Sequence, residues 1–104
     1  MEKEQFKLGQ RVWITKIYHR INGPWSKTHH GWEKKWRSCE TQPREGTLVG
    51  IRTLQDGYVI PHGDNHAWEP TNYKKAYIVA TSLHRRAVFV PPYAIFEIDN
   101  KPPT

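Results

Sequence analysis

Short runs of β-branched and aromatic residues alternate along this chain with polar stretches that are rich in glycine and proline. The first run, residues 6–14, opens the fold and predicts a strand after Gly9, in which Val12 and Ile14 share one face. The alternation fails at residues 16–17, which indicates a β-bulge or the end of that strand. Gly9, just before the strand, suits a turn that needs unusual backbone dihedral angles. The chain therefore opens with a strand.

A second strand region lies in the middle of the chain. Residues 44–54 predict a strand in which Gly50 marks a kink of the kind that small barrels need at their corners. The Asp56-Gly57 pair that follows is a strong signal for a two-residue hairpin turn, and residues 58–60 are the expected returning strand. This pattern predicts a β-hairpin that reverses at Asp56-Gly57.

The last third of the chain predicts the end of a small barrel. Residues 75–83 and 87–90 are two short strands, joined by a basic turn at residues 84–86. Two prolines then start one turn of helix at residues 91–95, before a closing strand at residues 96–99.

Two long polar segments interrupt the predicted strands. Periodicity disappears at residues 19–43, a segment far longer than the usual connection of about four to six residues. Trp32, Trp36 and Cys39 recur within it at helical spacing, which predicts one or two helical turns. Residues 62–74 form the second predicted polar loop.

Short strands, long loops and a late helical turn together predict an all-β, five-stranded barrel. The chain resembles SH3-like barrels of the KOW, Tudor and PWWP kind at residues 6–13, 46–50 and 90–95. The predicted fold is an SH3-like barrel with a long Trp-rich basic loop after strand one and a short helical turn before the last strand. Stand-alone barrels of this size also resemble small phage-encoded accessory proteins.

The likeness to PWWP domains does not extend to their ligand. Pro24-Trp25 is similar to the Pro-Trp pair of that family. Ser26 and Lys27 follow it, however, where the family continues with tryptophan and proline. The methyl-lysine binding of PWWP domains is therefore not predicted for this chain.

Length and charge narrow the classes of partner. The chain has 104 residues, the size of a single domain, and its polar ends at residues 1–5 and 100–104 are expected to fray. Sixteen Lys and Arg against ten Asp and Glu give a net charge of +6. Such a charge favours nucleic acid, anionic lipid or an acidic protein as partner, although it also serves solubility alone.

Cysteine usage and hydropathy predict the compartment. Cys39 is the single cysteine, so no intramolecular disulfide is expected. The sequence contains no apolar run of membrane-spanning length, and its first residues do not resemble a signal peptide. We therefore expect a cytoplasmic protein without a membrane partner.

Tryptophans interleaved with cations in the first polar segment carry the main functional prediction. Proteins that bind single-stranded nucleic acid use this combination, because cations contact phosphates while rings stack on bases, each stack contributing about 1–3 kcal/mol. Trp and Arg are also frequent hot-spot residues of protein interfaces. Alternatively, the tryptophans cover the core and the cations face solvent. The predicted partner-binding residues are Trp25, Lys27, Trp32, Lys34, Lys35, Trp36, Arg37, Arg85 and Arg86.

Basic residues also flank the first strand of the predicted C-terminal hairpin. Lys74 and Lys75 stand at its start, and Arg85 and Arg86 follow it. One interpretation is a row of phosphate contacts, which gives affinity without sequence choice. The other is protection of an exposed sheet edge, where charges keep neighbouring molecules from pairing with it.

Metal binding and catalysis find little support in the sequence. His62, Asp64 and His66 have a spacing that can surround a metal ion, but the group is isolated and a side-chain turn explains the same residues. No metal or other cofactor is predicted. Motifs of nucleophilic hydrolases, zinc proteases and phosphate-binding loops do not occur. The chain is predicted not to be an enzyme.

These features predict a non-enzymatic binding module. The favoured partner is nucleic acid, in single-stranded form, bound by the basic, Trp-rich loop. The alternative is a protein-interaction module, such as a small inhibitor or adaptor, that docks the same loop on an acidic partner.

Overall fold

The structure is a computed structural model that describes residues 6–82 and 84–99. The ends predicted to fray, residues 1–5 and 100–104, lie outside the described residues. The elements in chain order are β1 (Arg11–Ser26), β2 (Gly31–His62), β3 (Asn65–Ala80), β4 (Val88–Val90), a 3₁₀ turn η1 (Pro92–Ala94) and β5 (Ile95–Glu97). The described residues contain no α-helix, and the predicted all-β class is confirmed.

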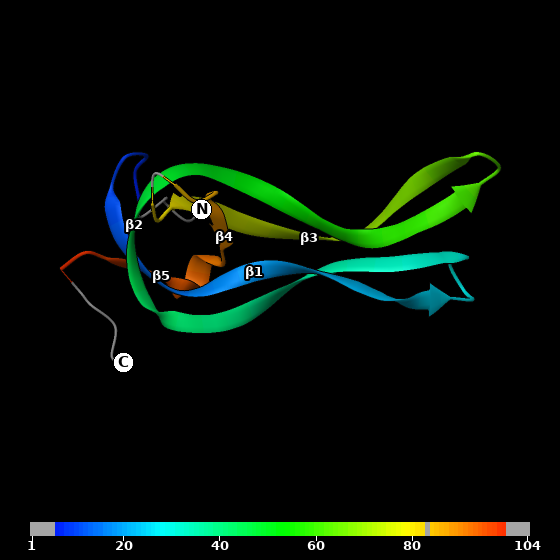
Figure 1. Ribbon diagram of the computed structural model, residues 1–104, viewed down its shortest axis with the longest axis horizontal. Helices are drawn as coiled ribbons and strands as arrows, with labels where there is room; N and C mark the ends of the chain where they lie inside the picture. Colours follow the sequence, from blue (N-terminus) through cyan, green and yellow to red (C-terminus); the bar gives the residue numbers. More distant parts are fainter. Residues whose placement is uncertain (1–5, 83, 100–104) are drawn as a thin grey trace, which may run out of the picture.

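The three long strands form two hairpins that share β2. β1 pairs antiparallel with residues 31–47 of β2, and β3 pairs antiparallel with residues 47–62. Figure 1 shows the two hairpins running side by side along the longest axis, away from the end that holds β4 and β5. We call residues 16–40 the first arm and residues 52–76 the second arm.

Two short strands complete a five-stranded sheet of order β4-β3-β2-β1-β5. β5 pairs with β1, where Val12 lies opposite Glu97. β4 pairs with β3, where Tyr77 lies opposite Val90, so the predicted pairing of the two C-terminal strands is confirmed. Among the described residues no ladder joins β4 to β5, and the sheet is therefore open.

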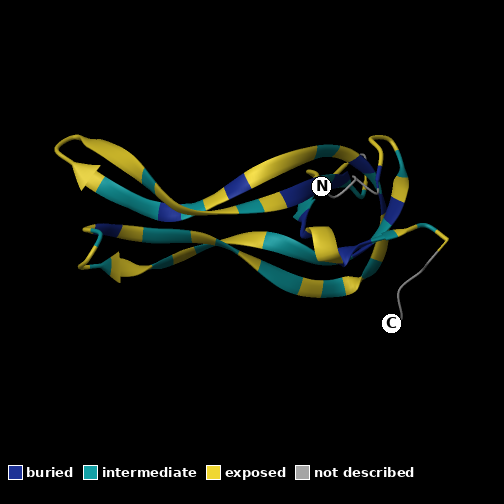
Figure 2. Ribbon diagram, turned by 180° about the vertical axis from the view of Figure 1, so that it is seen from behind, coloured by how far each residue is buried: buried dark blue, intermediate teal, exposed yellow. Residues whose placement is uncertain are grey.

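The hydrophobic core lies at the end that holds β4, η1 and β5, which we call the base (Figure 2). Side chains from all five strands and from η1 meet there. Trp13 adds a link across the base, because its indole N–H donates to the carbonyl of Ile98 at 2.9 Å. The core consists of Phe6, Val12, Ile14, Leu48, Tyr77, Val79, Val90, Ala94 and Ile95.

The predicted irregularities of the strands are present. The register of β1 with β2 shifts between Ile14 and Lys16, and that of β2 with β3 shifts between Leu48 and Gly50. Gly9 has a φ of 87°, which glycine adopts without a Cβ clash, and its N–H donates to the carbonyl of Leu48 at 2.7 Å. The predicted turn at Gly9 is confirmed. The first irregularity is a register shift that ends at Lys16, and not the end of the strand, and a second register shift lies beside Gly50.

The predicted long loop at residues 19–43 is wrong, because this segment forms most of the first arm. Trp32 and Trp36 lie in β2 and not in helical turns. A spacing of four residues fits a helix, but it also places two side chains on one face of a strand. Pairing with β1, in which Trp32 lies opposite Trp25, decides between the two.

The predicted hairpin turn at Asp56-Gly57 is also wrong. Both residues lie within β2, and Asp56 lies opposite Asn72 of β3. A Cβ at position 57 would collide with the backbone carbonyl of Glu69. The glycine therefore permits close approach of two strands instead of a reversal of the chain.

The second arm reverses further along the chain than the sequence predicts. Gly63, with a φ of 63°, lies in the turn between β2 and β3. The predicted strand at residues 58–60 is part of β2, and the predicted polar loop at residues 62–74 is mostly β3. His30, with a φ of 56°, lies in the corresponding turn of the first arm.

Candidate functional site

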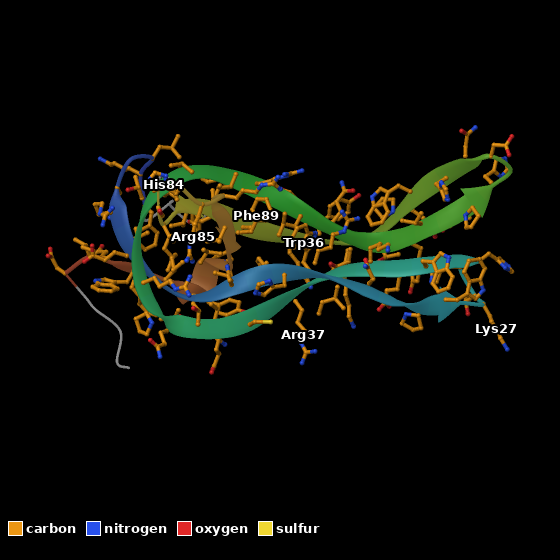
Figure 3. All side chains as sticks on the ribbon, in the orientation of Figure 1. Lys27, Trp36, Arg37, His84, Arg85 and Phe89 are labelled. Atoms are coloured by element: carbon orange, nitrogen blue, oxygen red, sulfur yellow. The ribbon has the colours of Figure 1, made fainter. Side chains whose placement is uncertain are left out.

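The predicted binding residues do not form one site. Figure 3 shows Lys27 at the tip of the first arm, Trp36 near the middle of the molecule and Arg85 at the base. The longest extent of the molecule is 52 Å. Residues at the tip and at the base therefore cannot contact the same phosphate group.

Trp25 and Trp32 form a cross-strand pair near the tip of the first arm. Their ring centroids are 5.3 Å apart with an interplanar angle of 75°, a favourable edge-to-face geometry. The exposed fractions are 42% for Trp25 and 49% for Trp32. Because the core lies at the base, these rings do not cover it, and the first arm presents an aromatic surface beside the exposed Lys27.

A groove of about 510 Å³ lies where the first arm meets the second arm and η1. Tyr18 of β1, Trp36 of β2 and Tyr93 of η1 provide its aromatic side chains. Segments that are far apart in the sequence therefore meet in this groove. Its complete lining is Tyr18, Lys35, Trp36, Arg37, Ser38, Lys74 and Tyr93.

Tyr93 is anchored at the groove without being buried. Its hydroxyl donates to Ser38 Oγ at 3.0 Å, and Lys16 Nζ lies 5.4 Å from the centroid of its ring. Ser38 lies opposite Tyr18 in the first arm. The 3₁₀ turn thus holds an exposed ring against the face of the arm that carries Tyr18.

Three side chains of β1 share that face. Lys16, Tyr18 and Arg20 alternate along a regular stretch of the strand, so all three project to the same side. Arg20 is exposed, lies opposite Trp36, and forms no ion pair with another described residue. The face therefore presents a tyrosine between two cations, next to a tryptophan.

Trp36 is held in place from the second arm. Its backbone N–H donates to Asp56 Oδ1 at 2.7 Å, and its carbonyl accepts from Lys74 Nζ at 2.6 Å. Its indole contacts Phe89 edge-to-face, with centroids 5.4 Å apart. The ring is half-buried at the point where both arms and β4 come together.

Of the other predicted cations of the first arm, Lys35 and Arg37 line the groove and Lys34 does not. Lys34 Nζ donates to Asn22 Oδ1 at 2.8 Å, and Lys35 Nζ lies 3.6 Å from Glu33 Oε1. Arg37 follows Trp36 in the strand, and its side chain points away from Trp36 in Figure 3. By alternation along β2, the Arg37 side chain projects to the face opposite Trp36 and Arg20, so Arg37 borders the groove from that side.

Two groups near the groove have perturbed acidities. Burial raises the pKa of Tyr18, and the neighbouring Tyr93 and Asp56 raise it further, so its phenol stays neutral. Burial by itself raises the pKa of Asp56. Hydrogen bonds from Trp36 N–H, Lys74 and Asn72, together with the charge of Lys74, outweigh burial and lower the pKa below its usual value. Asp56 is therefore a stable carboxylate at neutral pH.

Arg85 lies at the base (Figure 3). Arg85 and Arg86 both belong to the exposed connection between β3 and β4. Arg85 borders a second depression of about 460 Å³, together with Arg44, Thr81 and Ser82. These cations are separate from the groove.

The sequence prediction missed Tyr18, Tyr93 and Asp56 as site residues. Tyr18 had a usable signal, because the alternation of Lys16, Tyr18 and Arg20 marks one face of a strand. The prediction ended the first strand too early to use it. Asp56 carried no such signal, because its partners Trp36 and Lys74 are distant in the sequence.

Other sites are not found in the described part of the chain. His62, Asp64 and His66 are exposed near the tip of the second arm. No group of three or more His, Cys, Asp or Glu side chains is placed to hold a metal ion, and no helix is long and apolar enough to cross a membrane, within residues 6–82 and 84–99. Comparison of the chain with protein-family models, curated proteins and solved structures finds no match.

Proposed function

We propose that this protein is a non-enzymatic module that binds single-stranded nucleic acid in the groove between the arms and η1. The observation that carries the proposal is the groove with Tyr18, Trp36 and Tyr93 in its lining, flanked by Lys16 and Arg20, which share the face of β1 that carries Tyr18. Rings that stack on bases and cations that neutralise phosphates are the combination that single-strand binders use. The net charge of +6 adds long-range attraction for a polyanion.

The roles divide by position. Tyr93 and Trp36 are the stacking groups, and Lys16 and Arg20 contact the phosphates on either side of Tyr18. Trp25, Trp32 and Lys27 extend the surface toward the tip of the first arm. Arg85 and Arg86 provide separate phosphate contacts at the base for a longer strand. In a cytoplasmic setting Cys39 stays a free thiol.

The proposal includes the finer architecture of the base, which we assign to the SH3-like small barrels. The strand order, the 3₁₀ turn between β4 and β5, and a β2 shared by two hairpins support this assignment. β4 also contacts β1, although two strands lie between them in the sheet. The sheet therefore curls strongly toward closure at the base.

The second candidate function is binding to an acidic protein. The exposed Trp25–Trp32 pair favours it, because tryptophan is enriched at interface hot spots. In this case the tip of the first arm would make the principal contact, and the groove would be secondary.

Two equally exposed tyrosines provide the test for stacking. Tyr93 lies in the groove, with 61% of its surface exposed, and Tyr73 lies on the second arm with 60% exposed. Tyr93→Ala should weaken binding of a fluorescein-labelled oligothymidine by about 5- to 160-fold in an anisotropy titration, the range for one lost stack. Tyr73→Ala should leave the affinity unchanged. Equal effects, or no binding by the unmodified protein at low salt, would contradict the proposal.

Two arginines on opposite faces of the first arm provide the test for phosphate contact. For single strands, the slope of log K against log salt concentration is about −0.7 per phosphate neutralised. Arg20→Gln should lower the magnitude of this slope by about 0.7, because one phosphate contact is lost. Arg37→Gln should change it less, because Arg37 borders the groove from the opposite face of the arm and its side chain points away from Trp36 (Figure 3). A larger change in slope for Arg37→Gln than for Arg20→Gln would place the ligand on the other face of the arm.

A further inference from the structure

Side chains of the second arm form hydrogen bonds with both backbone groups of Trp36. A residue of an antiparallel strand directs its N–H and its C=O to the same side. In Trp36 these two groups bond to side chains of the second arm, Asp56 at 2.7 Å and Lys74 at 2.6 Å. Both groups therefore point away from β1, at a position where β2 is the outer strand of the first arm.

Asp56 and Lys74 also bind each other, so three groups form a closed set. Lys74 Nζ lies 3.0 Å from Asp56 Oδ2, and the exposed fractions of the side chains are 30% and 13%. The amide of Asn72 adds a longer contact to Asp56 Oδ2 at 3.4 Å. The carboxylate and the ammonium thus supply the acceptor and the donor that a neighbouring strand would otherwise offer to Trp36.

This arrangement separates the cations around the groove into two kinds. Lys74 lines the groove, but its charge is paired with Asp56 and one of its donors is engaged by the Trp36 carbonyl. Arg20 has no ion pair with another described residue. Of the two, Arg20 has its charge available for a ligand.

We propose that Asp56 and Lys74 are positioning residues, which fix Trp36 for stacking, and that Lys74 does not contact the phosphates. The inference rests on the proposed function, because it assigns roles within the same groove. A ring that is already held in its binding geometry loses less conformational freedom when a ligand stacks on it. Lys74 then raises the affinity by holding Trp36 in place, and its charge does not neutralise a phosphate of the ligand.

The salt dependence of binding tests the role of Lys74. Lys74→Met keeps most of the aliphatic stem and removes the ammonium group. We expect its affinity for the labelled oligothymidine to fall about five- to tenfold, a loss within the range of one weakened stack. The slope against salt should stay that of the unmodified protein, whereas Arg20→Gln should lower its magnitude by about 0.7. A slope lowered equally by Lys74→Met would make Lys74 a phosphate contact, and unchanged affinity would remove the positioning role.

A measurement without ligand tests the positioning of Trp36 separately. Protein labelled with 5-fluorotryptophan gives a fluorine resonance for Trp36, which Trp36→Phe identifies. Asp56→Asn keeps the size of the side chain but removes its charge, and it should shift or broaden this resonance. Asp64→Asn, at the exposed tip of the same arm, is the matched control and should leave the Trp36 resonance unchanged.

The salt series and the fluorine resonance together distinguish failure of the positioning role from failure of the proposed function. A Trp36 resonance that Asp56→Asn leaves unchanged overturns the positioning role, whether or not the oligonucleotide binds. A shifted resonance in a protein that binds no oligonucleotide overturns the proposed function and keeps the positioning role. If Lys74→Met does not fold, Asp56→Asn replaces it in the salt series, with reduced affinity and an undiminished slope as the expected result.

Discussion

The base and the two arms are built from the same three strands, yet different forces hold them. In the base, Val12, Ile14 and Leu48 are fully buried in one cluster. In the second arm, Leu54 and Ala76 are buried, and Figure 2 shows exposed and intermediate residues along most of both arms. The base is stabilised by burial of apolar surface, at about 1.5–3 kcal/mol for a large side chain, and the arms have few such residues.

The arms are instead joined to each other by polar and aromatic contacts. Asp56 and Lys74 bind the backbone of Trp36 across the arms. Nearer the tips, the ring of His29 stacks on Tyr58 with centroids 4.0 Å apart. A single two-stranded hairpin is only marginally stable in water, so each arm depends on the other. This division leaves the arm faces free to carry exposed cations and rings.

The largest expected effect comes from truncating a core residue of the base. Leu48→Ala should lower the free energy of unfolding by about 2–5 kcal/mol, because it leaves a cavity among buried side chains. Its neighbour Val49 is 49% exposed, whereas Leu48 is 0% exposed. Val49→Ala should therefore change the free energy by less than about 0.5 kcal/mol in the same urea titration. Similar losses for both variants would contradict the burial of Leu48 in the core that stabilises the base.

A smaller effect is expected from crowding the strands of the second arm. Gly57→Ala places a Cβ against the Glu69 carbonyl and should cost about 1–3 kcal/mol, as overpacked positions do. Gly63→Ala is the control, because an added Cβ meets nothing there and only the positive φ opposes it, at about 1 kcal/mol. Thermal melts of both variants compare the costs. A Gly57→Ala protein as stable as the unmodified one would mean that the two strands do not approach closely at this position.

The smallest expected effect on stability comes from the aromatic pair near the tip of the first arm. The coupling energy between Trp25 and Trp32 should be about 0.5–1.5 kcal/mol in a double-mutant cycle to alanine. The base should remain folded in all the variants. A loss of about 3–5 kcal/mol for Trp32→Ala alone would instead indicate a core residue, and the contrast between base and arms would fail at that position.

The base was largely predictable from the sequence because its strands follow local rules. Val12 and Ile14 alternate with residues that face outward, and Gly9 marks the turn before them. The strands around Tyr77 and Val90 are short, apolar and separated by a basic turn. In each of these strands one face is buried, and such a strand is recognised in sequence by the alternation of apolar and polar residues.

The arms were not predictable in the same way, because their strands bury little. Exposed residues on both faces remove the alternation, so the first arm resembles a loop in sequence. Gly57 serves close packing against Glu69, a role that a turn motif does not distinguish from a reversal. The groove depends on contacts such as Tyr93 with Ser38, which lie far apart in the sequence and leave no local pattern.

The pairing of β1 with β5 has a consequence for the newly made chain. Residues 16–40 contain both strands of the first arm, and a hairpin forms within about 1–10 μs, far faster than synthesis at about 5–20 residues per second. The base is complete only when Glu97 pairs opposite Val12 and the carbonyl of Ile98 accepts a hydrogen bond from the indole N–H of Trp13. Until those residues leave the ribosome, the core of the base is incomplete, and the first arm by itself is only marginally stable.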